Sequence, residues 1–130
     1  MTNKCAMAIR FLVWIVKRTP AAKDELAGWN STIQFLVDGE KPFFIEIRDH
    51  NMEYRAGEAA GAGLVFRSSS EEFLSVITGR TKFDQGFSGG KYAIEGSVVQ
   101  AVRLMRVAEI ASESHAALMA FLRSVLRLAF

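Results

Sequence analysis

The spacing of hydrophobic and polar residues changes twice along the chain. Over residues 5–18 apolar side chains recur every three or four positions, which predicts a helix, and a second short helix begins at Thr19 and Pro20 and runs to about residue 29. From residue 31 to residue 68 the spacing falls to two, which is typical of strands. After Ser69 the helical spacing returns. This order predicts an α+β fold in which helices cover a sheet.

Four strands are predicted in the region of period two, and short turns separate them. Turns fall at residues 38–40 and 49–51, where Asp, Gly, His and Asn cluster. Alternating strands joined by short turns predict an antiparallel meander with one packed face and one wet face. The packed face is predicted to hold Ile33, Phe35, Val37, Phe43, Ile45, Ile47, Met52, Tyr54, Leu64 and Phe66.

The segment after the meander contains a capping box, which marks the start of a helix. Ser69 is predicted as the N-cap and Glu72 as its partner at the third helical position. Phe73, Leu74 and Ile77 would form the buried stripe of this helix. A fifth strand is then predicted at residues 91–95.

Two further helices are predicted at the end of the chain. The last, over residues 113–130, has apolar residues on one face and Arg123 and Arg127 on the other. The earlier one, over residues 97–112, is expected to turn a stripe toward the sheet and to place Arg103 and Arg106 opposite it. That stripe consists of Val98, Ala101, Val102, Met105 and Ala108.

Composition narrows the class of protein and its partners. The chain has 130 residues, half of them hydrophobic, which is enough to bury one core in a single domain over residues 1–130. Basic residues, 16 against 14 acidic ones, form no cluster, which argues against nucleic acid as a partner. The lone Cys5 excludes an intramolecular disulfide and favours a reducing, cytoplasmic location. The apolar run over residues 5–16 is too short to span a bilayer and lacks a signal-peptide cleavage pattern.

Candidate catalytic and metal-binding residues are sparse. His50 is expected in a solvated turn, and His115 at a helix junction beside Glu113. A triad of His115, Glu113 and a serine can be drawn, but neighbours in sequence do not converge on one point. The capping box already explains the acidic pair at 71–72, and one cysteine with two distant histidines does not supply a zinc site. We therefore predict no catalytic residue, no metal and no cofactor, and a protein that is not an enzyme.

Two segments resemble a known family. "SSSEEFLSVITGR", followed by "FDQGFSGGKYAIEGSVVQAVRLM", is similar to the sterol carrier protein type 2 domain family. The resemblance covers about residues 29–107, with Gly86, Tyr92 and the "AAGAG" stretch as departures. The matching positions are Ser70, Glu71, Glu72, Phe73, Leu74, Thr78, Gly79, Arg80, Gln85, Phe87, Gly90, Lys91, Ile94, Glu95 and Gly96.

The resemblance implies a five-stranded, mostly antiparallel sheet, covered on one face by helices with an apolar tunnel between the layers. It implies a non-catalytic lipid-binding or lipid-carrier protein for a fatty acid, sterol, phospholipid or prenyl lipid. Periodicity alone favours an ordinary close-packed core and does not distinguish a lipid cavity from it. The residues expected to contact lipid are Phe35, Ile45, Phe73, Leu74, Ile77, Phe83, Gln85, Phe87, Ile94, Val98, Val102 and Met105, with Phe83 and Phe87 as a wall or lid.

A second hypothesis is an accessory factor that holds prenylated intermediates, for example in ubiquinone biosynthesis. It depends on the terminal helices over residues 5–28 and 113–130, which are additions to the resembling region. The first helix is apolar on two faces, so it is sandwiched or meets a partner. Both terminal helices are candidates for contact with a membrane surface or a partner enzyme, and the alternative, which we favour, is that they cover the core or form the interface of a homodimer.

Overall fold

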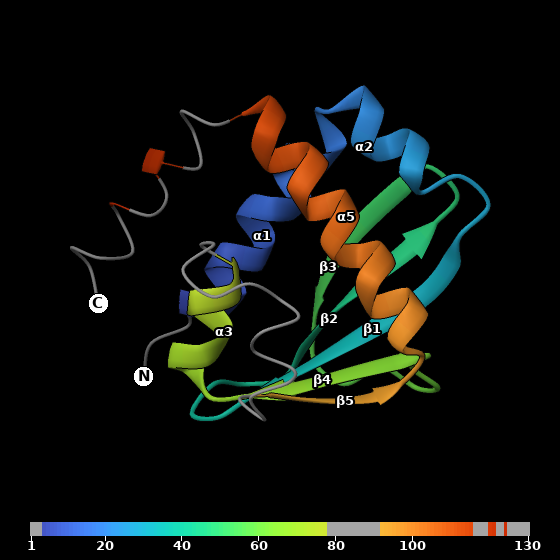
Figure 1. Cartoon of the computed structure of the whole chain (residues 1–130). Helices are drawn as coiled ribbons and strands as arrows, with labels where there is room; N and C mark the ends of the chain where they lie inside the picture. Colours follow the sequence, from blue (N-terminus) through green and yellow to red (C-terminus); the bar gives the residue numbers. More distant parts are fainter. Residues whose placement is uncertain (1–3, 78–91, 116–119, 122–123, 125–130) are drawn as a thin grey trace.

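The chain folds into a layer of helices packed on one face of a sheet (Figure 1). The computed structural model describes residues 4–77, 92–115, 120–121 and 124. The helices are α1 (Lys4–Lys17), α2 (Pro20–Glu25), α3 (Ser70–Ile77) and α5 (Val98–Ser114). The strands are β1 (Asn30–Val37), β2 (Phe43–Arg48), β3 (Asn51–Ala56), β4 (Leu64–Ser68) and β5 (Tyr92–Gly96). The predicted α+β fold is confirmed.

The five strands lie in the order β3-β2-β1-β4-β5, with β1 in the centre. β1 pairs antiparallel with β2 and parallel with β4, so Ile33 lies opposite Ile45 on one side and Leu64 on the other. β2 with β3 and β4 with β5 are also antiparallel pairs. The sheet is therefore mostly antiparallel, as predicted, but the predicted meander is wrong, because β4 lies beside β1 and not beside β3.

The connection between β3 and β4, residues 57–63, explains the departure from a meander. Seven extended residues can span roughly 23 Å, whereas three strand spacings cover about 14 Å. Gln34, buried on the face of β1 opposite the helices, fastens this connection. Its side-chain NH₂ donates to the carbonyl oxygens of Phe43 (2.9 Å) and Gly57 (3.1 Å), and its side-chain oxygen accepts from the N–H of Ala59 (2.7 Å). The polar side chain is tolerated because these bonds satisfy it.

Four phenylalanines form the centre of the core, where α3 meets the sheet. Phe73 of α3 is 1% exposed, and its ring meets those of Phe35 and Phe66 edge-on, with centroids 5.6 Å apart in both pairs. Phe43 stacks on Phe35 at 5.3 Å. Edge-to-face and offset-stacked pairs are the favourable aromatic arrangements. The cluster therefore fixes the position of α3 against β1, β2 and β4.

Side-chain caps start α3 and α5. The Ser69 hydroxyl accepts a hydrogen bond from the N–H of Glu72 (3.2 Å), which confirms Ser69 as the predicted N-cap. The Ser97 hydroxyl likewise accepts from the N–H of Gln100 (3.2 Å). Just before it, Gly96 has a φ of +106°, and a Cβ there would lie 2.4 Å from the carbonyl oxygen of Gly63, the residue that leads into β4. Only glycine permits this close approach between the end of β5 and the start of β4.

A carboxylate from the β1–β2 turn caps α1. The two oxygens of Glu40 accept hydrogen bonds from the backbone N–H groups of Cys5 (3.0 Å) and Ala6 (3.2 Å). A negative charge at this end of a helix satisfies free donors and opposes the helix dipole favourably. The Cys5 side chain is buried behind the cap, and burial raises the pKa of its thiol to about 12. The start of α1 is thereby tied to the sheet.

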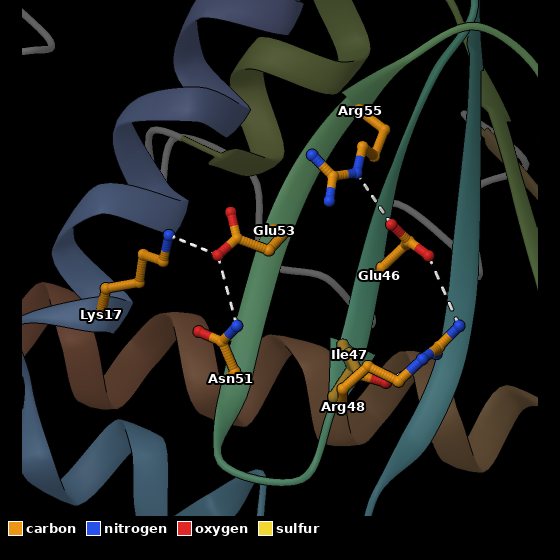
Figure 2. Close-up of polar contacts among 7 residues, drawn as sticks. All are labelled: Lys17, Glu46, Ile47, Arg48, Asn51, Glu53 and Arg55. Carbon is orange, nitrogen blue, oxygen red and sulfur yellow. Dashed lines mark hydrogen bonds and ion pairs between the residues drawn. The ribbon is translucent and has the colours of Figure 1, made fainter.

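Ion pairs lie along β2 and β3 (Figure 2). Lys17, at the end of α1, pairs with Glu53 of β3 at 2.6 Å, and the hydrogen bond from Lys17 lowers the pKa of Glu53. Glu46 of β2 lies between Arg48 (3.4 Å) and Arg55 (2.9 Å). These side chains are partly or largely solvated, so each pair contributes little stability. The strand residues of these pairs make the sheet face opposite the helices polar, as the alternation predicts.

Candidate functional site

An apolar cavity of about 30 Å³ lies between the helices and the sheet. Within the part of the chain that the structure describes, its lining side chains are all hydrocarbons, apart from one thioether. They come from α1, β1, β4, α3 and α5 and are Ile9, Leu12, Ile33, Phe35, Leu64, Phe66, Phe73, Ala101, Leu104, Met105 and Ala108. These side chains offer no hydrogen-bonding group, so the cavity suits the hydrocarbon part of a molecule.

Small residues on α5 leave this space open. Ala101 and Ala108 lie two helical turns apart on the wall, where longer side chains would fill the gap to the rings of the sheet. Arg103 fixes the position of this helix. Its guanidinium donates to the carbonyl oxygen of Glu25 (2.9 Å) and to that of Ala27 (3.1 Å), at the end of α2. Arg103 was expected on the side of this helix opposite the predicted stripe, and the structure shows that its guanidinium contacts the end of α2.

Of the residues predicted to contact lipid, the structure brings three into the cavity wall: Phe35, Phe73 and Met105. Ile45 and Leu74 are buried in the same core but do not line the cavity. Ile94 is partly buried and packs against that core.

Val98 and Val102 do not face the sheet, contrary to the sequence prediction. They are 44% and 54% exposed. The buried stripe of α5 consists of Ala101, Leu104, Val107 and Ala111. It is rotated by about one residue, roughly 100°, from the predicted stripe. α1 and α2 also pack on α5. They bury residues on a side of α5 that would be exposed if the helix contacted the sheet alone.

The remaining predicted contacts lie outside the described residues. Phe83, Gln85 and Phe87 belong to the segment 78–91, and Ile77 lies in α3 without a described side chain. Their assignment to lipid binding stays a prediction.

Sequence reasoning missed most of the cavity wall. Ile9 and Leu12 come from α1, outside the region that resembles the family. Ile33, Leu64 and Phe66 were placed on the packed face of the sheet without being singled out. Their alternation with polar neighbours was the signal available, but it identifies a core position and not a cavity position.

The cavity is small for a lipid. Pockets that hold drug-sized ligands have volumes of about 300–1,000 Å³, roughly ten to thirty times the volume found here. An acyl chain or a sterol therefore needs the helical layer to move away from the sheet. The buried residues of α5 pack against α1 and α2, and its polar contacts include those of Arg103 and the hydrogen bond between the side chains of Ser31 and Gln100 (2.6 Å).

The candidate catalytic groups lie apart. His50 sits in the β2–β3 turn, exposed and 3.1 Å from Asp49, and both residues have positive φ. His115 ends α5, where its N–H donates to the carbonyl of Ser112. Within residues 4–77 and 92–115, no three His, Cys, Asp or Glu side chains gather as a metal site would require. In that same part of the chain, no helix has the length and apolar character to cross a bilayer.

Known structures show the same arrangement of a sheet with helices on one face. One is titled "UbiJ-SCP2 Ubiquinone synthesis protein", with a TM-score of 0.66 and 16% identity, covering 82% of this chain and 94% of that chain. Another is apo sterol carrier protein 2 from Yarrowia lipolytica, with a TM-score of 0.63 and 15% identity over 82% and 88% of the two chains. The sec-alkylsulfatase Pisa1 from Pseudomonas sp. matches with a TM-score of 0.57 and 11% identity over 68% of this chain, but only 14% of the enzyme. At these identities the likeness establishes the fold. None of the curated proteins matches the chain significantly in sequence.

Helices on one face of a five-stranded sheet, with an apolar cavity between the layers, define a sterol-carrier-like α+β domain. The model of the SCP-2 sterol transfer family matches residues 14–109, most of the chain, and the protein belongs to that family. The match begins within α1, upstream of residue 29, so it includes the last turn of α1 and all of α2, which the sequence resemblance left out. Membership implies lipid binding or transfer as the general function, in a family whose members are generally non-catalytic carriers.

Proposed function

We propose that this protein is a non-catalytic lipid carrier, a single domain that holds the hydrocarbon part of its ligand between α1, α3, α5 and the sheet. The observation that carries the proposal is the cavity whose lining side chains are wholly apolar. It lies between the layers, where the family resemblance implies a tunnel. Among the described residues that line the cavity no side chain recognises a polar headgroup, so shape and length would decide ligand specificity at this wall.

The free energy of binding is supplied by apolar burial. Each buried methylene contributes about 0.8 kcal/mol, so a chain of about 16 carbons offers on the order of 12 kcal/mol before ordering costs. That gain must also offset the separation of α5 from the sheet. The separation is easier at Ala101 and Ala108, because their small side chains have little packing to give up. A fatty acid, sterol, phospholipid or prenyl lipid satisfies this chemistry, and the single buried Cys5 suits a cytoplasmic location.

Lipid extraction tests the proposal directly. The purified protein is extracted with organic solvent, the extract is analysed by mass spectrometry, and the delipidated protein is titrated with a fluorescent fatty acid. We expect a co-purifying lipid or saturable uptake at one site. The proposal is wrong if neither is found.

The second candidate is an accessory factor that presents a prenylated intermediate to a partner enzyme. It is favoured by the fold likeness to the structure titled as a ubiquinone synthesis protein. Displacement of the fluorescent fatty acid by a polyprenyl phenol, by cholesterol and by palmitate separates the two candidates. Preference for the prenyl compound supports the accessory factor, whereas equal displacement supports a general carrier.

A further inference from the structure

One face of α1 turns away from the cavity and carries both aromatic and cationic side chains. Met7, Arg10, Phe11 and Trp14 follow one stripe of the helix, and Arg18 lies just beyond its end at Lys17; we name these five residues the α1 outer face. Met7 and Trp14 are 40% and 42% exposed. Four of these residues, Met7, Arg10, Phe11 and Trp14, line a shallow open hollow of about 430 Å³. Exposed large apolar groups gathered around a hollow mark an interaction site.

The two arginines of this face are stacked on aromatic rings. The guanidinium carbon of Arg18 lies 4.1 Å from the centroid of the Trp14 ring, and that of Arg10 lies 5.5 Å from the centroid of Tyr54. Neither guanidinium is paired with a carboxylate among the residues that the structure describes. Stacking orients the planar group and leaves its N–H edges available for bidentate bonds to a carboxylate. The Cα atoms of the two arginines are separated by about 12 Å of helical rise, roughly two turns.

We propose that the α1 outer face binds an acidic amphipathic helix of a partner protein. Apolar anchors at positions i, i+4 and i+7, as Met7, Phe11 and Trp14 present them, are the pattern used when one helix packs against another. Two acidic side chains of the partner, about two turns apart, would pair with Arg10 and Arg18. The hollow favours protruding side chains over the smoother surface of a bilayer.

Charge favours an acidic partner helix on this face over two other occupants, a second copy of the chain and the chain's own C-terminal segment. A second copy would bring the same arginines face to face, because α1 contains no acidic residue. The chain's own segment 116–130 contains Arg123 and Arg127 and no acid, so it cannot neutralise the face either. Like charges held together in an interface are unfavourable.

A peptide-binding experiment tests the proposal. The probe is a fluorescein-labelled amphipathic helical peptide with leucines along one face and two glutamates two turns apart at its edge. Matched peptides carry glutamine or lysine in place of glutamate. Fluorescence anisotropy should show saturable binding of the glutamate peptide to the wild-type chain, with the glutamine peptide at least about tenfold weaker.

Variants of the face provide the controls. Arg10→Gln with Arg18→Gln should weaken the glutamate peptide by a similar factor, whereas Arg48→Gln with Arg67→Gln, exposed arginines on β2 and β4, should not. Arg10→Glu with Arg18→Glu should transfer preference to the lysine peptide.

Equal binding of all peptides, or an equal effect of the control pair, overturns the proposal. The proposal is also overturned if the glutamate peptide does not bind and the chain instead floats with phosphatidylglycerol vesicles or forms a dimer in analytical sedimentation. Fatty acid uptake should be unchanged in every variant, so failure here is distinct from failure of the carrier function.

Discussion

The guanidinium of Arg103 lies over the indole ring of Trp29, with 4.7 Å between its central carbon and the ring centroid. The same group donates hydrogen bonds to the carbonyl oxygen of Glu25, the last residue of α2, and to that of Ala27 just after it. One side chain on α5 therefore joins α2 and the start of β1. A cation stacked on an aromatic ring and bonded to carbonyls at a helix C-terminus is favourable on both counts.

Replacing this arginine should loosen the helical layer. We expect Arg103→Ala to lower the free energy of unfolding by about 1–3 kcal/mol, since it removes charge-assisted hydrogen bonds and ring stacking. Arg106→Ala is the matched control, because its 3.5 Å pair with Glu25 is solvated and should contribute less than about 1 kcal/mol. Urea denaturation of both variants measures the difference, and equal losses would show that the stacked position has no special role.

The junction of β5 with α5 should not tolerate a side chain. We expect Gly96→Ala to destabilise the fold by about 3 kcal/mol or more, because a positive φ and a Cβ against the Gly63 carbonyl act together. Gly39 also has a positive φ, but a Cβ added there would meet no other atom within 4 Å. Gly39→Ala should therefore lower the free energy of unfolding by only about 1 kcal/mol. Thermal unfolding of the two variants, followed by circular dichroism, compares them. A cost at Gly96 no larger than that at Gly39 would contradict the close approach.

Filling the cavity should reduce lipid binding with little effect on the fold. Ala108→Leu projects a larger side chain into the cavity wall, and we expect at least about tenfold weaker uptake of the fluorescent fatty acid. Val99→Leu is the matched control, because Val99 is 78% exposed on the same helix. Unfolding curves of both variants confirm that the chains are folded. Unchanged uptake by a folded Ala108→Leu chain would place the ligand elsewhere.

The thiol of Cys5 should be unreactive while the protein is folded. A pKa raised to about 12 by burial leaves very little thiolate at pH 8, so a thiol reagent should modify Cys5 only as fast as the chain opens. Because the folded pKa lies above the ordinary value of 9.0, the unfolded chain releases the proton first as pH rises. The stability contributed by Cys5 is thus complete below pH 9 and declines toward pH 12. Relative to Cys5→Ala, the wild type should lose stability across that window, and urea midpoints measured at about pH 8 and about pH 10.5 test it.

Local signals predicted the elements well. The cap at Ser69 follows from a hydrogen bond to the N–H of Glu72 only three residues away, so the sequence contains the whole interaction. The alternation that buries Ile33 and Phe35 and places Gln34 on the other face is equally local. Such interactions involve residues close together in the sequence, so a sequence motif can predict them.

Relationships between distant elements were not predictable in this way. The placement of β4 beside β1 depends on where Gln34 binds the connection, and a connection of that length reaches either side of the sheet. The buried face of α5 was mistaken because apolar residues occur nearly all around this helix, so hydrophobicity alone does not select Leu104 over Val102. The cavity exists because small residues of α5 face the phenylalanine rings of the sheet. Hydrophobic periodicity does not predict the width of the space between them.

The parallel pairing of β1 with β4 sets the order in which the sheet can form. β1, β2 and β3 follow one another through short turns and can pair within microseconds of synthesis. The other edge of β1 keeps its N–H and C=O groups unpaired until the chain has been made as far as Ser68. An open strand edge next to apolar side chains such as Phe35 is a template for pairing with another nascent chain. β1, the central strand of the finished sheet, is therefore an edge strand in the nascent chain, and it is there that the chain is most exposed to misassembly. Chaperone binding should concentrate at this strand.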